Sequence, residues 1–105
     1  MQKQSKFKVG CVQAGSVFFD LEGCLDKAQQ FIDQAKKEGV KLLVFPETFI
    51  PGYPSGLGFG TVVGSRTELG RDQYKQYWQN SVQVPSEETE RLGNMAKEAE
   101  LFLVM

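Results

Sequence analysis

The sequence predicts an α/β fold: a βαβ unit followed by a long loop, two helices and a third strand. Three short apolar runs, residues 7–14, 40–45 and 101–105, have the length and composition of buried strands. The segment between the first two runs has helical periodicity. Strand, helix and strand within about 40 residues favour two parallel strands joined by a right-handed crossover.

The first strand is expected over Phe7–Ala14. Its residues Val9, Cys11 and Val12 leave little polar face, which is typical of a strand covered on both sides. The second strand is expected over Val40–Phe45, a run that is apolar except for one lysine. We therefore expect both strands to lie in a parallel sheet.

The helix between these strands is expected to begin after an Asp20 N-cap and to end near Glu38. Lys36 and Lys37 fall in its last turn, where they oppose the negative end of the helix dipole, and Gly39 suits a left-handed cap. The apolar positions that predict its buried face are Leu21, Cys24, Leu25, Ala28, Phe31, Ile32 and Ala35.

The second half of the chain begins with residues 46–70, where three prolines and six glycines argue against a regular element. Long irregular stretches in compact domains are usually functional. A helix is expected over Arg71–Asn80, with Tyr74, Tyr77 and Trp78 packing on the sheet or on a neighbouring subunit. Ser86 is expected to cap a further helix, and residues 101–105 form the third strand.

The sequence stops inside this third apolar run. We therefore expect residues 1–105 to be the N-terminal part of a larger α/β domain, cut at its third strand. The alternative is a complete three-stranded domain, but so small a parallel sheet would leave exposed edges and little core.

The composition excludes several functions. With 12 Lys+Arg against 13 Asp+Glu, the net charge of −1 gives no basic surface for nucleic acid. No apolar run reaches the roughly 18 residues of a membrane span. An apolar signal segment is also missing, so a cytoplasmic location is expected. The lack of histidine excludes Ser-His-Asp or Cys-His pairs and His-ligated zinc within the chain.

Glu47 is the main candidate for chemistry, because it follows a buried strand by two residues. In open α/β sheets, ligands bind beyond the carboxyl ends of the strands. Pro46 ends the strand and directs Glu47, and a loop rich in aromatic residues is expected to desolvate the carboxylate partly, as suits a general base. A solvated loop glutamate is the alternative, and position alone leaves both open.

Residues 45–54, Phe-Pro-Glu-Thr-Phe-Ile-Pro-Gly-Tyr-Pro, resemble the segment around the first catalytic glutamate of the nitrilase (carbon–nitrogen hydrolase) superfamily. Residues 9–14, Val-Gly-Cys-Val-Gln-Ala, are similar to the first strand of that family, commonly written V-x-x-V-Q-A. Residues 56–61 and 64–67 resemble the branch of true nitrilases. The resemblance covers nearly the whole chain.

This resemblance implies an α-β-β-α sandwich and a Glu-Lys-Cys triad, with Glu47 as the catalytic glutamate. The lysine and the nucleophilic cysteine of the family are expected beyond residue 105, so the isolated chain is expected to be inactive. Cys11 and Cys24 are expected to be core residues rather than nucleophiles. Tyr53 is expected to line the substrate pocket, and Thr48 and Phe49 only to help position Glu47.

The implied reaction converts a small nitrile to a carboxylic acid and ammonia through a thioimidate and an acyl-enzyme, without metal or organic cofactor. The full-length protein is expected to be a homo-oligomer without nucleic-acid or membrane partners. One alternative is a nitrile-hydrating or amide-hydrolysing relative. The other is a non-catalytic binding or assembly module that docks onto intact subunits through its open strand edges or its aromatic helix.

Overall fold

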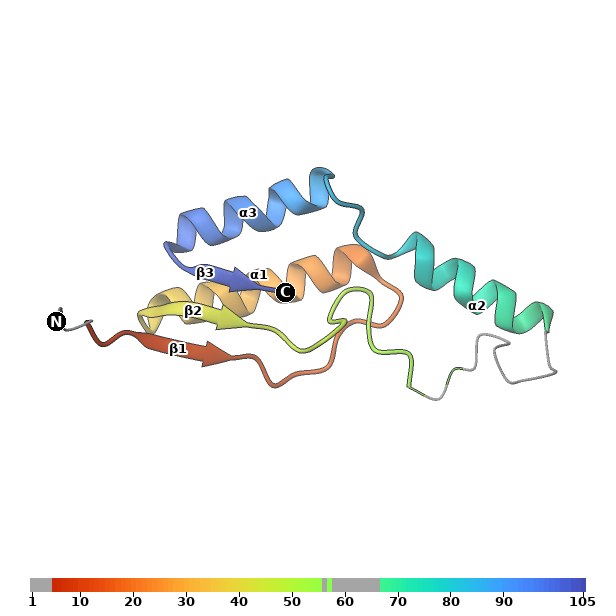
Figure 1. Cartoon of the computed structure of the whole chain (residues 1–105), viewed down its shortest axis with the longest axis horizontal. Helices are drawn as coiled ribbons and strands as arrows, with labels where there is room; N and C mark the ends of the chain where they lie inside the picture. Colours follow the sequence, from red (N-terminus) through yellow and green to blue (C-terminus); the bar gives the residue numbers. More distant parts are fainter. Residues whose placement is uncertain (1–4, 56, 58–66) are drawn as a thin grey trace, which may run out of the picture.

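The computed structural model describes residues 5–55, 57 and 67–105. Its elements are β1 (Lys8–Cys11), α1 (Leu21–Lys37), β2 (Val40–Val44), α2 (Glu68–Gln79), α3 (Glu87–Ala99) and β3 (Phe102–Val104). The strands form one parallel sheet in the order β1-β2-β3 (Figure 1). The α/β class and the predicted order of elements are confirmed. Residues 56, 58–61 and 64–66, which carry most of the resemblance to true nitrilases, lie outside the described residues.

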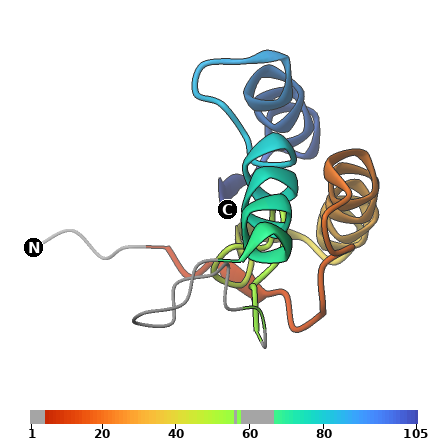
Figure 2. The same ribbon diagram turned by 90° about the vertical axis from the view of Figure 1, so that its right-hand side faces the viewer.

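Helices α1 and α3 lie side by side on the same face of the sheet (Figure 2). The register aligns Gly10 with Leu43 and Leu43 with Leu103, and this row faces the two helices. A Cβ atom added at Gly10 would lie 3.2 Å from Leu43 Cδ1, so β1 packs closely against the side chains of β2 here. The arrangement is the right-handed βαβ crossover that the sequence predicts.

The opposite face of the sheet carries the rows Val9–Leu42–Phe102 and Cys11–Val44–Val104. Val9 and Phe102 are 55% and 78% exposed, and Cys11 is exposed as well. The prediction that β1 is covered on both sides, with Cys11 in the core, is therefore wrong for the described residues. Side chains alternate across a strand, and Cys11 points to the face without helices. In an α-β-β-α sandwich, such an apolar face packs on the second sheet.

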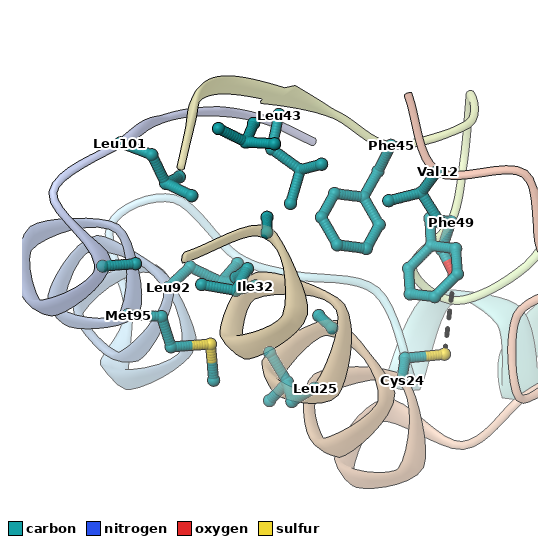
Figure 3. Packing of buried hydrophobic residues seen from close by; sticks show 14 residues of the cluster. Val12, Cys24, Leu25, Ile32, Leu43, Phe45, Phe49, Leu92, Met95 and Leu101 are labelled. Carbon is teal, nitrogen blue, oxygen red and sulfur yellow. Dashed lines mark hydrogen bonds between the residues drawn. The ribbon is translucent and has the colours of Figure 1, made fainter. Parts of the chain in front are cut away.

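The hydrophobic core lies between the sheet and the two helices (Figure 3). Helix α1 contributes the residues Cys24, Leu25, Ala28, Ile32 and Ala35, none more than 5% exposed. Leu43 and Phe45 come from the sheet side, and Leu92 and Met95 from α3. Burying a large apolar side chain stabilises a fold by about 1.5–3 kcal/mol. The helical periodicity thus predicted this face of α1 correctly.

The helix ends follow the local signals in the sequence. Asp20 caps α1, its carboxylate accepting a hydrogen bond from the Gly23 amide at 2.9 Å. Gly39 follows the helix with a φ of 74°, as predicted for a left-handed cap. Ser86 caps α3 in a reciprocal pair with Thr89, the two hydrogen bonds measuring 3.3 and 2.9 Å.

Helix α2 begins at Glu68 rather than at the predicted Arg71. The Thr67 hydroxyl accepts a hydrogen bond from the Gly70 amide at 3.0 Å and so caps the helix. This cap offsets the poor helix propensity of Gly70, which had suggested an irregular segment. Helix α2 thus begins within the segment that its glycine content predicts to lack a regular element.

The aromatic residues of α2 do not pack on the sheet, contrary to one of the two predicted roles. Helix α2 extends away from the sheet (Figure 1), and Tyr74 and Trp78 are 57% and 69% exposed. The half-buried Tyr77 contacts Phe19, with the ring centroids 6.0 Å apart. The Asn80 side chain accepts a hydrogen bond from the Leu21 amide at 3.3 Å. Contact with a neighbouring subunit stays a prediction.

Replacing Asp20 by alanine is expected to lower the free energy of unfolding by about 1 kcal/mol, because the Gly23 amide loses its acceptor. Asp20→Asn keeps an N-cap oxygen and is expected to stay within a few tenths of a kcal/mol of wild type. Urea unfolding followed by circular dichroism measures both values. Equal losses in the two variants would contradict the capping role.

Candidate active site

The carboxyl ends of the three strands meet at one edge of the sheet. The ladder continues past the strands, with the Val12 amide donating to the Val44 carbonyl at 2.8 Å and the Phe45 amide to the Val104 carbonyl at 2.9 Å. Pro46 follows immediately and has no amide to donate. Glu47 therefore leaves the central strand at the edge where α/β sheets bind ligands.

Glu47 opens a tight turn over residues 47–51. The Phe49 amide donates to the Pro46 carbonyl at 3.2 Å, and the Gly52 amide to the Thr48 carbonyl at 2.9 Å. The turn folds the chain back toward the core. The backbone of Glu47 is thus fixed by the hydrogen bonds of its neighbours.

The Glu47 side chain is exposed in the described structure. The predicted partial desolvation under aromatic residues is therefore wrong for these residues. Phe49 turns inward instead: it is 3% exposed, with its ring centroid 5.0 Å from that of Phe45. Tyr53 is 66% exposed. The turn that fixes the Glu47 backbone thus takes the nearest aromatic ring away from its carboxylate.

Thr48 marks this turn as strained. Its φ is 53°, which is rare for a β-branched residue. Its Oγ1 is buried, and no hydrogen-bond partner for it occurs among the described residues. Such strain costs about 1–3 kcal/mol and is concentrated at functional sites. Thr48 therefore supports, independently of any motif, a functional role for the turn that Glu47 begins.

A hollow of about 320 Å³ lies beside this turn. The turn contributes Thr48, Phe49 and Ile50, and the far walls come from the segment between α2 and α3, from α3 and from Met105. Its lining is mainly apolar and also includes the hydroxyl-bearing residues Thr48, Ser81 and Thr89.

The segment between β1 and α1 braces the turn from the other side. The Phe19 amide donates to the Pro51 carbonyl at 3.0 Å, and Pro51 is fully buried. Gly52 has a φ of 119°, and a Cβ atom there would lie 2.5 Å from the Phe18 ring and 2.8 Å from Ser16 Oγ. Only glycine fits this contact.

The Cys24 side chain contacts both the β1–α1 segment and the turn that Glu47 begins. Its Sγ lies 3.0 Å from the Val17 carbonyl oxygen. It also lies 3.5 Å from the Phe49 carbonyl oxygen (Figure 3). The prediction that Cys24 is a core residue is confirmed, but its link to the turn of Glu47 was missed. The Pro51-Gly52 pair is a turn signal that could have indicated the Gly52 contact. Nothing local to Cys24 indicates which carbonyl lies opposite its thiol.

Burial raises the pKa of the Cys24 thiol. Because the folded state holds the proton more tightly than the unfolded state, this contribution to stability is complete below the ordinary thiol pKa of 9.0. It is lost as the pH rises through the folded-state pKa. We expect the stability of wild type to fall more steeply above pH 9 than that of Cys24→Ser, measured by urea unfolding. Parallel curves would contradict this.

Neither cysteine is placed as a nucleophile for Glu47. Cys11 lies on the uncovered face of the sheet, and the Cys24 thiol is buried against backbone carbonyls. Within the described ranges, no three side chains of the metal-ligating types gather in one place. In the same ranges no helix combines the length and apolarity needed to cross a membrane. The site thus offers one carboxylate on a rigid turn, open to solvent.

The chain is similar to known proteins over most of its length. The model of the carbon-nitrogen hydrolase family matches residues 8–105. The chain is 44% identical over 101 residues to nitrilase 3 of Arabidopsis thaliana and 42% identical over 94 residues to a bifunctional nitrilase/nitrile hydratase of Nicotiana tabacum. It is 40% identical over 101 residues to an aliphatic nitrilase of Sinorhizobium fredii (strain HH103).

These matches cover 96%, 90% and 96% of this chain, but 29%, 27% and 33% of the three relatives. The chain thus spans about a third or less of the length of the relatives it matches. The matched residues contain the βαβ unit, the Pro-Glu turn and the third parallel strand. The chain belongs to the carbon-nitrogen hydrolase family.

Proposed function

We propose that this chain supplies the general base, Glu47, to a nitrilase-type hydrolase that converts a nitrile to a carboxylic acid and ammonia. The observation that carries the proposal is the place of Glu47: on a braced turn at the carboxyl edge of the central strand, in a chain 40–44% identical to the three nitrilases described above. The family and its hydrolase class support an enzyme of this kind.

In the proposed reaction, the Glu47 carboxylate accepts the proton of a cysteine thiol that the rest of the domain supplies. The sulfur attacks the nitrile carbon, and the nitrile nitrogen takes up a proton, which gives a thioimidate. Water then adds to this carbon, and the nitrogen leaves as ammonia. A second water hydrolyses the acyl-enzyme to the acid and free thiol. A lysine, also from the rest of the domain, stabilises the developing charge.

The exposure of Glu47 fits a triad whose lysine and cysteine come from the rest of the domain. A base that acts on a thiol needs to lie within hydrogen-bond reach of it in the assembled site. An open carboxylate on a fixed backbone leaves room for a lysine and a cysteine from another part of the domain. Covering by that part would supply the low-dielectric surroundings that the described residues do not provide around Glu47.

Tyr53 is proposed to line the substrate pocket. It follows the buried Pro51 and the tightly packed Gly52, so packing of these two residues fixes the position of its backbone. Its ring is 66% exposed and therefore available for contact with a substrate or with the rest of the domain. We propose a small nitrile as the substrate and no metal or organic cofactor.

The full-length protein is further proposed to be a homo-oligomer that acts in the cytoplasm. The exposed aromatic side chains of Tyr74 and Trp78 on α2 suit a protein–protein contact. Light scattering on the full-length protein tests the oligomer. A monomer at micromolar concentration would contradict it.

The experiment on function uses a fused enzyme: residues 1–105 followed by the part of the Sinorhizobium fredii aliphatic nitrilase that lies beyond its matched segment. Incubation with aliphatic and aromatic nitriles is expected to release acid and ammonia in equal amounts. The 105-residue chain alone is expected to give no turnover. A correctly folded fused enzyme that leaves every nitrile unchanged would contradict the proposal and favour a non-catalytic assembly module.

A nitrile-hydrating activity is the second candidate. The Nicotiana tabacum relative is named a bifunctional nitrilase/nitrile hydratase, which favours this candidate. Amide in place of acid and ammonia would identify it in the same assay. Hydrolysis of amides but not nitriles would indicate an amide-hydrolysing relative.

A further inference from the structure

We propose that Cys24 is a positioning residue for Glu47: its thiol ties the segment between β1 and α1 to the turn that carries the carboxylate. The inference rests on the proposed function, because it assumes that Glu47 takes a proton from a nucleophile. Cys24 is fully buried, and its Sγ lies 3.0 Å from the Val17 carbonyl oxygen and 3.5 Å from that of Phe49. One donor thus serves two segments that are far apart in sequence.

The Phe49 carbonyl matters because of its distance from Glu47 along the chain. Upstream, Phe45 is fixed to the sheet by its 2.9 Å hydrogen bond to the Val104 carbonyl. Downstream, the next anchored residue is Phe49, whose ring is buried and whose carbonyl faces Cys24. A shift of the Phe49 carbonyl therefore moves the backbone of Glu47 relative to the sheet.

The same two segments meet at a second place. The Phe19 amide donates to the Pro51 carbonyl, and Gly52 packs against Phe18. Among the described residues, three other than glycine have positive φ, and Phe19 and Thr48 of these two segments are two of them. Strained backbone persists where the surrounding contacts over-determine it. The contacts of Cys24 and Phe19 thus act together on the turn of Glu47.

The thiol can act only while it is protonated, because a thiolate has no proton to donate. Burial raises its pKa, so Cys24 remains a thiol at neutral pH. The thiol is a weak donor. Its effect is therefore expected in the geometry of the turn and less in overall stability.

Two substitutions separate the hydrogen bonds of Cys24 from its volume. Cys24→Ser keeps a donor, whereas Cys24→Val keeps an apolar side chain of similar size without a donor. Ile32→Val is the matched control. Ile32 lies on α1 and is as deeply buried as Cys24, and its replacement by valine removes one methylene from the core outside the two bridged segments. A purely structural role of Cys24 would make Cys24→Val resemble Ile32→Val.

The first readout is hydrogen exchange of the Phe19 and Gly52 amides in the fused enzyme, since these amides donate to carbonyls of the turn. We expect about 10-fold faster exchange at both in Cys24→Val, on the scale of local opening. Exchange at wild-type rates is expected in Cys24→Ser and Ile32→Val. Unchanged protection in Cys24→Val, or equal loss in Ile32→Val, would overturn the proposal without reference to activity.

The second readout is the kinetics of the fused enzyme. In Cys24→Val we expect kcat to fall about 10- to 100-fold with KM unchanged, because small displacements of a reacting group have effects of this size. Cys24→Ser is expected to have a kcat close to that of wild type. Wild-type kcat in Cys24→Val, alongside an inactive Glu47→Gln, would overturn the role of Cys24 alone. An active Glu47→Gln would instead overturn the proposed function.

Discussion

Glu47→Gln in the fused enzyme is expected to lower kcat by about 10²- to 10⁴-fold, the usual contribution of a general base. Glutamine has nearly the shape of glutamate but cannot accept the thiol proton at neutral pH. The free energy of unfolding is expected to stay within about 0.5 kcal/mol of wild type, since Glu47 is exposed. Steady-state ammonia release and urea unfolding measure the two effects.

Two further variants define the role of this carboxylate. Glu98→Gln is the matched control, an exposed glutamate on α3, and is expected to leave kcat unchanged. Glu47→Asp keeps a base but withdraws it by one methylene, and is expected to retain an intermediate kcat. A Glu47→Gln enzyme as active as Glu98→Gln would remove Glu47 from the mechanism.

Gly52→Ala is expected to destabilise the chain by about 2–4 kcal/mol, the sum of backbone strain and overpacking. The backbone φ of 119° disfavours any side chain at this position. The added methyl would also lie 2.5 Å from the Phe18 ring and 2.8 Å from Ser16 Oγ. Urea unfolding of the fused enzyme measures the loss.

Gly93→Ala is the control for this variant. Gly93 lies in α3, and nothing approaches within 4 Å of a Cβ atom placed there. Alanine is expected to stabilise the helix by up to about 1 kcal/mol. If both alanine variants gained stability, the close packing of Gly52 against the β1–α1 segment would be disproved.

The elements that the sequence predicted well have local causes or follow a general rule of chain topology. The buried stripe of α1 follows from helical periodicity, and Asp20 and Gly39 bound the helix through contacts within a few residues. The parallel pairing of β1 and β2 follows from the crossover rule. The stripe and the caps depend on residues close together in the chain, and the pairing depends on a general rule of chain topology.

The predictions that failed depended on the packing of distant segments. Cys11 looked like a core residue because its neighbours are apolar, yet the described chain covers only one face of β1. Glu47 was expected beneath aromatic residues, but Phe49 packs on Phe45 instead. The link from Cys24 to the Phe49 carbonyl joins residues 25 positions apart, and no sequence pattern encodes it.

The position of Glu47 was predictable because a strand followed by Pro-Glu has one geometric outcome at the sheet edge. Its rigidity was not predictable. It arises from the positive φ of Thr48, the buried Pro51 and the close contact of Gly52 with Phe18. These features appear only when the β1–α1 segment and the turn are seen together.

The central claim is that Glu47 removes the proton from the nucleophilic thiol. It is tested most directly by the rate at which the fused enzyme forms its covalent adduct with a slowly hydrolysed nitrile, followed by mass spectrometry of the intact protein. We expect wild type to accumulate one adduct on the nucleophilic cysteine, and Glu47→Gln to form it at least about 100-fold more slowly. Adduct formation at the wild-type rate in Glu47→Gln would show that the thiol loses its proton without this carboxylate.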